Sequence, residues 1–486
     1  MARGENPHFN PTQMAEAIRR QFDAVGQRRL DNQEGKKTAE LPRVEIPENR
    51  PRPSLKYQQI DDACRDGNFA KAGTMAEEIL AENPDDLHAI YLLSRILVDS
   101  GKPGIAQSLA KRLISEAPHK PQGWLMLGAV EATLQRPEES ILAIEKCLEI
   151  EKGWAEPYRC LSSSLVLLNR LDEAEAAAWK AIEFEDHHIP RAALAFVEMH
   201  RRNWAAGWEH YRHQLGRVKH RDMLDFGIPE WQGEPERGSL LVYAEQGLGD
   251  QLCYVSAIEQ CKQLVCHPKL ESLLRRSLPN IEVYGDQFKN PVTFDITSKY
   301  QTSMASAMRW QEVKRRGRWL VPHPEKKIQW RALMDAKERY KGAPWVGIGW
   351  TGGSIGSAGW KDRNLKPHDL KPILDLPLNF VSLEYRPHTP PPGVHMWPWG
   401  TQTPDYEDTA ALVDNLQAVV SVPTTVYHLA GSLGIPAHVI VHRSPHFHEG
   451  IEGDSPWWES VSFYRRTEMS TEECVQKIAD KLKELI

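Results

Sequence analysis

The feature that most constrains this chain is a repeat of 34 residues that begins near residue 55. Small and apolar residues return at matching positions of successive blocks. In the first two blocks these are Gly67, Phe69, Ala72, Ala76, Ile79 and Pro84, and then Gly101, Pro103, Ala106, Ala110, Leu113 and Pro118. The next two blocks hold Trp124, Leu127, Gly128, Ser140 and Leu148, and then Tyr158, Leu161, Leu165, Leu171, Ala174, Ala178 and Ile182. This period predicts helix pairs that stack, each covering the apolar face of its neighbour.

Small residues where two helices cross, with proline at the exit, are the pattern of tetratricopeptide repeats. We therefore expect an all-α solenoid over residues 55–222, closed by a degenerate repeat that ends in Asn203–Leu215. Such arrays bind peptides or other proteins, so a protein partner is expected. The pattern leaves open whether the repeats are a plain scaffold or recognise a substrate.

The segment before the repeats, residues 1–54, is predicted to be a helix followed by a linker. Apolar residues recur at helical spacing over residues 11–30, which is compatible with either a docking helix or a loosely packed one. Residues 31–54 contain four prolines and many charges, so they are predicted to be disordered.

The overall composition narrows the class of partner. The formal net charge is −6, which gives no general attraction to phosphate backbones, so nucleic acid is not expected as a partner. No apolar stretch reaches the roughly 18 residues of a membrane span, so no transmembrane segment is expected and the cytoplasm is the predicted compartment. The seven cysteines are scattered, without zinc spacing, and are predicted to be reduced thiols.

After residue 228 the pattern changes to short apolar runs that alternate with helical patterns. The predicted strands are 240–244, 263–266, 281–284, 345–350, 380–383, 418–422 and 436–441. This alternation predicts doubly wound α/β layers, arranged as two Rossmann-like lobes with a ligand in the cleft between them. The chain is thus expected to be multi-domain, with an all-α repeat array followed by an α/β region.

A glycine-rich turn follows the first strand, in AEQGLGDQLCYVSAI. Gly247 and Gly249 permit a tight turn, and Asp250 is predicted to begin a helix. Helix starts attract anions, which makes this turn a candidate ligand-contacting loop. The alternative is that Asp250 is only an N-cap. The full GxGxxG fingerprint is missing, which argues against a dinucleotide dehydrogenase.

A second turn, in VGIGWTGGSIGSAGWKDRNLKP, contains Gly352 and Gly353 and is followed by Lys361 and Arg363. Basic side chains above a glycine-rich turn suit a pyrophosphate. The alternative is that both are solvated surface charges. The P-loop pattern is absent, so ATP-driven chemistry loses its main support.

A third turn, in SVPTTVYHLAGSLG, joins strand 418–422 to a helix. The backbone N–H groups and hydroxyls of Thr424 and Thr425 would form an anion site aimed into the cleft, where a departing nucleoside diphosphate requires one. An ordinary threonine cap is an equal alternative. His428, on the same helix, is predicted to line the cleft or simply to pack.

Several chemistries lack their usual motifs. The chain has no Asp-x-Asp pair, which metal-dependent transferases commonly use to hold a divalent ion and diphosphate, so no metal site and no cofactor are expected. GxSxG and HExxH are also missing, which removes the commonest hydrolases. His442, His446 and His448 have no paired carboxylate motif and are predicted to lie at the surface or the cleft rim.

At these three turns the sequence resembles tetratricopeptide-repeat proteins with a C-terminal domain like the ADP-heptose:lipopolysaccharide heptosyltransferases, glycosyltransferase family 9. It is more distantly similar to the protein O-linked N-acetylglucosamine transferases. The likeness covers the repeats and residues 228–466, through IPEWQGE, YAEQGLGDQLCYVSAI, VGIGWTGG, FVSLEY, DTAALVDNLQAVVSVPTTVYHLAGSLG and SPWWESVSFYRR. It implies a GT-B fold, with residues 228–330 on the acceptor side and 340–486 on the nucleotide-sugar side.

The resemblance also implies an inverting transfer from a nucleotide-sugar to a glycan, a lipid-linked sugar or a protein. Asp250 falls on the proposed catalytic base, and Thr424 and Thr425 fall on the diphosphate-binding turn. Lys361 lies near the phosphate-contacting lysine and Glu384 near the ribose-contacting acid. Gly247, Gly249, Gly352, Gly353, Arg363 and His428 complete the expected donor site.

One departure from the family pattern is Pro423, where relatives usually have Asp in VDTxxxHLAG. Proline has neither an N–H nor a carboxylate, so the turn and any hydrogen bond from that Asp are altered. The alternative function is therefore a non-catalytic repeat protein that binds partners and carries a degenerate two-lobed domain.

Overall fold

The computed structural model describes residues 55–65, 68–215, 223–236, 238–285, 294–352 and 363–486. The chain divides into two compact units, Met1–Gln58 and Gln59–Ile486. The helix and linker predicted over residues 11–30 and 31–54 lie outside the described residues, as do Gly353 and Lys361.

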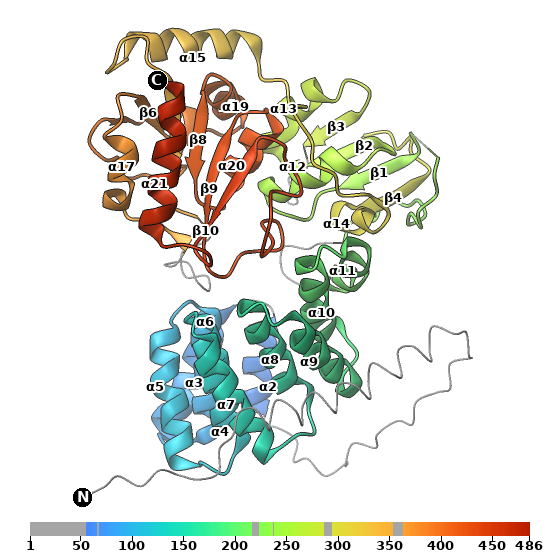
Figure 1. Ribbon diagram of the computed structural model, residues 1–486. Helices are drawn as coiled ribbons and strands as arrows, with labels where there is room; N and C mark the ends of the chain where they lie inside the picture. The colour runs from blue at the N-terminus through green and yellow to red at the C-terminus, as the bar shows by residue number, and fades with distance from the viewer. Residues whose placement is uncertain (1–54, 66–67, 216–222, 237, 286–293, 353–362) are drawn as a thin grey trace, which may run out of the picture. The chain divides into compact units, whose positions relative to one another are not determined.

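The repeats form helix pairs, as the 34-residue period predicts. The first helices of the pairs are α2 Leu55–Arg65, α4 Leu87–Asp99, α6 Pro121–Thr133, α8 Ala155–Leu167 and α10 His188–His200. The second helices are α3 Phe69–Glu82, α5 Pro103–Glu116, α7 Pro137–Ile150, α9 Leu171–Phe184 and α11 Trp204–Tyr211, which runs into the short η1 Arg212–Gln214. Figure 1 shows this stack in blue to green. The degenerate last repeat is thus a helix pair like the others.

The turn inside each pair repeats with the sequence period. One residue per turn has a left-handed backbone: Gly101 (φ 72°), Gln135 (60°), Asn169 (59°) and Arg202 (62°). Small residues let the helices of a pair approach closely, as expected. A Cβ atom at Gly128 would lie 2.4 Å from Ile144 Cδ1, so α6 and α7 pack this closely only because position 128 has no side chain.

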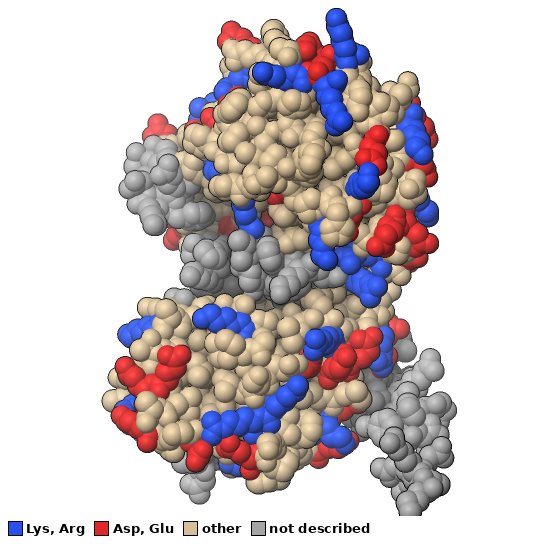
Figure 2. All heavy atoms as spheres, turned by 90° about the vertical axis from the view of Figure 1, so that its left-hand side faces the viewer, with Lys and Arg blue, Asp and Glu red and all other residues tan. Residues whose placement is uncertain are grey.

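The surface of the repeats is charged and mixed in sign. Figure 2 shows acidic and basic side chains interleaved on the face that it draws. Two ion pairs join successive repeats: Arg95 contacts Asp61 at 2.5 Å, and Arg112 contacts Asp85 at 2.8 Å. Exposed pairs of this kind contribute little to stability, so the apolar contacts between helices carry most of it.

Two parallel sheets follow the repeats. The first has the order β3-β2-β1-β4, and its strands are β1 Leu240–Tyr243, β2 Cys261–Cys266, β3 Glu282–Gly285 and β4 Tyr300–Ser303. The second has the order β10-β9-β8-β5-β6-β7, with β5 Trp345–Gly349, β6 Asn379–Ser382, β7 Val394–His395, β8 Ala418–Ser421, β9 Ala437–Val441 and β10 Val461–Arg465. We call the regions built on these sheets the first lobe and the second lobe.

Helices cover the sheets, which gives the α/β fold that was predicted. The longer ones are α12 Leu248–Ala257, α13 Pro268–Ser277, α15 Pro324–Ala336, α19 Glu407–Val413, α20 Thr425–Ser432 and α21 Thr471–Leu482. In the second lobe, Val346 and Ile348 pack with residues of α21, while Trp345 on the same strand packs with residues of α19 and α20. Alternate residues of β5 are therefore buried on opposite faces, as in a doubly wound sheet.

Short helical segments complete the two lobes. These are α14 Met304–Ala307, η2 Met308–Trp310, η3 Pro367–Leu370, α17 Lys371–Leu374, α18 Pro398–Thr401 and η4 Lys483–Leu485. Strands β4, β7 and β10 were missed by the sequence patterns, and residues 300–343 contain β4, α14 and α15. No helix among the described residues is long and apolar enough to cross a membrane.

The last repeat shares a core with the two lobes. One continuous buried cluster contains Trp208 of α11, Leu252 of α12 and Leu429 of α20. The Trp208 ring makes edge contacts with Tyr254 of α12 (5.1 Å between centroids) and with Phe447 of the second lobe (5.7 Å). The earlier repeats have small cores of their own, so α10 and α11 join the array to the lobes.

Candidate functional site

The strand order of each lobe marks one edge as the place for a ligand. In the first sheet the order reverses between β1 and β4, and in the second between β5 and β8. In open α/β sheets, ligands bind outside the carboxyl ends of the strands at such a switch point. Helix α12 follows β1 and helix α20 follows β8, so both candidate turns begin at a switch point.

The two turns approach each other closely. A Cβ atom at Gly249 in α12 would lie 2.9 Å from His428 Cδ2 and 3.4 Å from Thr425 Cα in α20. The turn after β5 joins them, because a Cβ atom at Gly352 would lie 2.9 Å from the carbonyl oxygen of Pro423. All three glycine- or threonine-bearing turns that the sequence indicated therefore meet at one place.

Asp250 lies in the first turn of α12. The helix begins at Leu248, two residues earlier than expected, and Asp250 is its third residue. Asp250 Oδ2 accepts a hydrogen bond from Gly247 N–H (3.1 Å), which caps the helix. Asp250 Oδ1 lies 2.6 Å from His448 Nε2, which belongs to the second lobe. The Asp250 side chain keeps 28% of its surface exposed.

The charge state of Asp250 follows from these neighbours. Burial alone raises the pKa of its carboxyl group, but the hydrogen bond and charge of His448, the charge of His446 and the Gly247 N–H act in the other direction. Their sum holds the pKa of Asp250 below its ordinary value. Asp250 is therefore a carboxylate at neutral pH, as a general base must be.

The segment that carries His448 is held by buried polar groups. Arg465, at the end of β10, donates hydrogen bonds to the carbonyl oxygens of Glu449 (2.9 Å), Gly450 (2.7 Å) and Gly453 (2.7 Å). The Glu449 carboxylate accepts from Tyr427 Oη of α20 (2.6 Å) and from His446 N–H (3.1 Å). Because Arg465 and Glu449 are almost fully buried, these bonds fix the segment firmly.

His428 has a defined protonation state. Its Nδ1 accepts a hydrogen bond from the Trp458 indole N–H (3.1 Å), and Cys253 Sγ lies 2.9 Å from the same nitrogen. An indole nitrogen can only donate, so Nδ1 carries no proton and the neutral ring is protonated on Nε2. Burial also moves the pKa of His428 well below its ordinary value. The Cys253 contact joins the two lobes a second time.

The third turn has the geometry of a capped helix N-terminus. Thr424 is the N-cap of α20, and its hydroxyl oxygen accepts from Val426 N–H at 3.3 Å. Ser421 Oγ, at the end of β8, lies 3.3 Å from the same hydroxyl. An ordinary threonine cap and an anion site are compatible at this turn, because a capping threonine still leaves other N–H groups of the first turn without intrahelical partners.

Glu384 lies at the carboxyl end of β6, beside the turn after β5. Its Oε1 accepts from the backbone N–H groups of Trp350 and Thr351, each at 2.7 Å, and its Oε2 accepts from the Thr351 hydroxyl. The side chain is almost fully buried. In this arrangement Glu384 holds the turn, and the ribose contact implied by the resemblance stays a prediction.

Arg363 lies near two histidines of the same edge. Its charge, together with burial as the larger cause and the charge of Arg466, lowers the pKa of His442 to about 3. Its charge also contributes to the lowered pKa of His446, for which burial is again the main cause. Asn364, the next residue, accepts from Gly352 N–H at 2.7 Å. At the carboxyl edge of the second sheet, the guanidinium of Arg363 thus lies near His442 and His446, whose pKa values are lowered.

Of the histidines at positions 442, 446 and 448, the first and last are buried and His446 is half-buried. His442 and His448 each retain only 4% exposure, and the rings of His446 and His448 stack at 5.1 Å between centroids. The sequence reading missed the pairing of His448 with Asp250, since 198 residues separate the two. Among the described residues, no group of three or more His, Cys, Asp or Glu side chains is placed to hold a metal ion.

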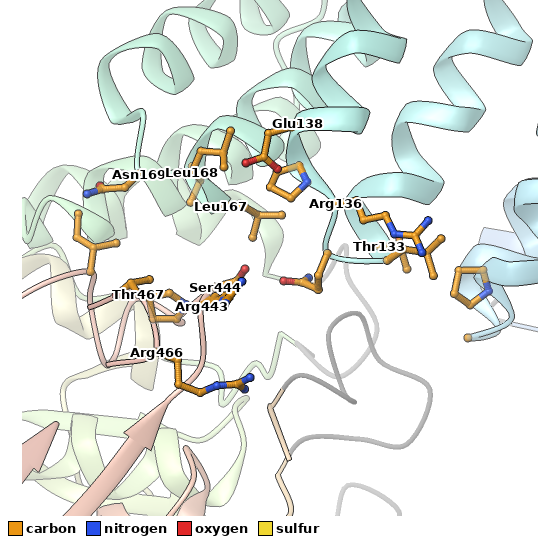
Figure 3. Close-up of a pocket in the computed structure, with 18 of the residues that line it drawn as sticks. Thr133, Arg136, Glu138, Leu167, Leu168, Asn169, Arg443, Ser444, Arg466 and Thr467 are labelled. Atoms are coloured by element: carbon orange, nitrogen blue, oxygen red, sulfur yellow. The ribbon is translucent and has the colours of Figure 1, made fainter. Parts of the chain in front are cut away.

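A groove of about 1560 Å³ opens at the same edge of the second lobe. One wall consists of repeat turns at residues 101–105, 133–138 and 166–169. The other wall is the chain after β9 and β10, at residues 443–445, 451–452 and 466–468. Figure 3 shows Arg443, Ser444 and Thr467 across the groove from Leu167 and Leu168.

Comparison with known proteins identifies the repeats. Residues 64–130 match the model of the tetratricopeptide repeat. The N-terminal region of the chain therefore contains tetratricopeptide repeats. No curated protein matches the chain.

Solved structures are similar to the repeat region. A thermophilic tetratricopeptide-repeat protein from Thermus thermophilus is 22% identical, and the match covers 34% of this chain and 90% of that one, with a TM-score of 0.32. MamA is 15% identical over 32% of this chain and 91% of its own, with a TM-score of 0.26. The Cut9 and Hcn1 hetero-tetramer of the APC/C is 18% identical over 34% of this chain and 32% of that one, with a TM-score of 0.31.

Proposed function

We propose that this chain is an inverting glycosyltransferase of the GT-B type, which moves a sugar from a nucleotide-sugar donor to a hydroxyl acceptor without a metal ion. The observation that carries the proposal is the meeting of the two switch points. A carboxylate on α12 of the first lobe and the N-terminus of α20 in the second lobe lie on either side of Gly249. A direct displacement requires a base and an anion-stabilising helix end in one site, and α12 and α20 bring the two into the same region.

The proposed step uses Asp250 as the general base. Asp250 takes the proton of the acceptor hydroxyl, the acceptor oxygen forms a bond to the anomeric carbon, and the bond from that carbon to the diphosphate breaks. The electron pair leaves with the diphosphate, whose new charge is stabilised by the N–H groups at the start of α20 and by the guanidinium of Arg363. Each carboxylate oxygen of Asp250 has one protein partner, so lone pairs remain for the proton.

The acceptor is proposed to be a glycan, a lipid-linked sugar or a protein segment. The groove between the repeat turns and residues 443–445 supports this, because it opens on the carboxyl edge of the second sheet. A protein partner bound by the repeats would lie near this edge.

A second candidate function is partner binding without catalysis. Two observations favour it: Pro423 replaces the family's aspartate, and the close packing of Gly249 on α20 leaves little room at the helix end in this conformation. In that case the repeats would carry the function, and the two lobes would serve as a structural block or a nucleotide sensor.

Thermal unfolding with nucleotides separates the two candidates. The full chain is heated with ADP, UDP, GDP or CMP, with and without magnesium, because a ligand at about 100 times its dissociation constant adds roughly 2.7 kcal/mol of stability. Stabilisation by one nucleotide without magnesium supports the donor site. The matching nucleotide-sugar should then release its diphosphate nucleotide in the wild type, and Asp250→Asn should reduce that rate about 100- to 10,000-fold. Nucleotide binding with no release of product would favour the second candidate.

A further inference from the structure

The Asp250 carboxylate is oriented by two groups from different lobes. Gly247 N–H holds Oδ2 from within the first lobe, and His448 Nε2 lies 2.6 Å from Oδ1 and comes from the second lobe. Gly247 belongs to the same turn as Asp250, so it fixes the carboxylate relative to α12 alone. The His448 bond relates the carboxylate to the lobe that carries α20.

His448 is itself held in one orientation. Its ring packs on His446 (5.1 Å between centroids), Trp457 (5.5 Å) and Tyr254 (5.9 Å). The backbone on its C-terminal side is fixed by Arg465, which donates to three carbonyl oxygens. His448 Nδ1 is buried and has no hydrogen-bond partner among the described residues. Only Nε2 thus makes a polar contact, and that contact is with Asp250.

The buried Nδ1 argues against His448 as the base itself. A base must reach the acceptor proton with a free lone pair, and Nδ1 does not reach open space in this structure. Asp250, in contrast, is partly exposed. The two residues therefore have different roles: the Asp250 carboxylate takes the proton, and the His448 imidazole holds that carboxylate in place.

We infer that His448 is a positioning residue, which fixes the Asp250 carboxylate for proton transfer only when the two lobes are together. The inference rests on the proposed function of Asp250 as the base. It assigns to the second lobe, in addition to holding the donor, the task of completing the base in the first lobe.

The charged surroundings of Asp250 make the inference testable by pH. The loop after β9 brings His446 and Glu449 close, helix α12 brings Cys253 and Tyr254, and helix α20 brings Tyr427 and His428. Burial lowers the pKa of both His446 and His428 and raises the pKa of Cys253, Tyr254 and Tyr427, so burial favours the neutral form of each of these groups. His448 is therefore the main group that opposes the effect of burial on Asp250.

The first test compares His448→Phe with His448→Gln in the full chain. Turnover is measured as release of the diphosphate nucleotide from ADP-glucose, UDP-N-acetylglucosamine or GDP-mannose, whichever carries the nucleotide that stabilises the protein. In His448→Phe, kcat should fall about 10- to 100-fold with the donor KM unchanged, because the base is misplaced and the donor site is not. The acidic limb of the pH profile should move to higher pH, since burial now acts on Asp250 without the bond that opposed it. His448→Gln, which keeps an N–H donor, should recover most of the rate.

His438→Phe is the matched control. His438 is also a buried histidine of the second lobe, but its ring nitrogen contacts Tyr464 Oη at 3.1 Å and not Asp250. The His438→Phe variant should change the stability of the protein without moving the acidic limb of the pH profile of turnover. A wild-type rate and pH profile in His448→Phe would overturn the inference, as would equal losses in the Gln and Phe variants with unchanged profiles.

A second measurement does not depend on activity. With ¹⁵N-labelled histidine in the full chain, the resonance missing from His448→Gln identifies His448. We expect it to be protonated on Nε2 in the wild type and to shift in Asp250→Asn. If no donor is turned over but this signature is present, the proposed function fails while the pairing stands. If the ring is instead protonated only on Nδ1, the inference fails even in an active enzyme.

Discussion

Gly249 lies where α12 and α20 meet, and its lack of a side chain determines how closely the two lobes approach. Thr425 Cα is backbone and cannot move without the helix, whereas His428 is a ring held by Trp458 and Cys253. Neither neighbour can yield easily to an added methyl group. A substitution at Gly249 therefore tests the contact between the two lobes.

We expect Gly249→Ala to destabilise the protein by about 1–3 kcal/mol, the usual cost of overpacking a tight contact. The reason is the 2.9 Å approach that the new Cβ would make to His428. The measurement is the shift of the thermal transition, combined with nucleotide affinity. Gly153→Ala is the control, because a Cβ there meets nothing within 4 Å. Equal effects of the two substitutions would mean that the α12–α20 contact is not tight in solution.

Single residues also show what sequence reasoning could reach at the site. Gly247, Gly249, Asp250, Thr424 and Thr425 could be proposed from the sequence because each lies in a local turn whose spacing can be read along the chain. His448 was not found, because its significance depends on a bond to a residue in the other lobe. Arg465 was missed for a similar reason: a buried guanidinium bound to carbonyl oxygens leaves no sequence pattern.

Among the secondary-structure elements, the repeat turns are the most regular feature. Each of the four turns from α4–α5 to α10–α11 has one residue with positive φ, and among these four residues only Gly101 is glycine. For other residues the left-handed backbone costs roughly 1–2 kcal/mol. Gln135, Asn169 and Arg202 adopt this unfavourable backbone because the turn connects the two helices of each pair.

Two glycines three positions apart test this reading of the turn. Gly101→Ala should destabilise the repeats by roughly 1 kcal/mol, because its φ of 72° is unfavourable for alanine. Gly104→Ala, in the first turn of α5 with open space around it, should instead stabilise them by about 0.4–1 kcal/mol. The melting of the repeats, followed by helical circular dichroism, gives both values. Two shifts of the same sign would contradict the left-handed assignment of residue 101.

The strands show why part of the fold was not predictable. β5, β8 and β9 are apolar runs buried on both faces, so their composition reveals them. β4 is polar, with Gln301, Thr302 and Ser303 buried. Gln301 bonds to Phe226 N–H and Ile228 O, and Thr302 to Glu230, all more than 70 residues earlier. A strand whose buried groups are satisfied so far away gives no local signal.

For the whole molecule, the aromatic contacts of α11 couple the last repeat to both lobes. Trp208→Ala should cost about 3–5 kcal/mol, the range for a buried tryptophan, and should lower the melting of the two lobes together with that of the last repeat. Calorimetry of the full chain measures the melting of the lobes and of the last repeat.

Trp124→Ala is the comparison for that experiment. Trp124 lies in α6 and packs with a cluster of other repeat residues, so its loss should affect the repeats and leave nucleotide stabilisation of the lobes unchanged. Two results would contradict the coupling. One is a loss of nucleotide stabilisation in Trp124→Ala. The other is a Trp208→Ala variant that keeps nucleotide stabilisation and whose lobes melt at the wild-type temperature.

The shared core of α10, α11 and the lobes also sets where evolution could recombine this gene. Upstream of His188 each repeat packs mainly on its neighbours, so whole repeats could be duplicated or lost there without breaking the shared core, and the change would fall on the repeat wall of the groove. A crossover after Tyr211, at the apparent end of the repeats, would strip the aromatic rings that cover Tyr254 and Phe447. The unit of inheritance is therefore the two lobes with their last helix pair attached.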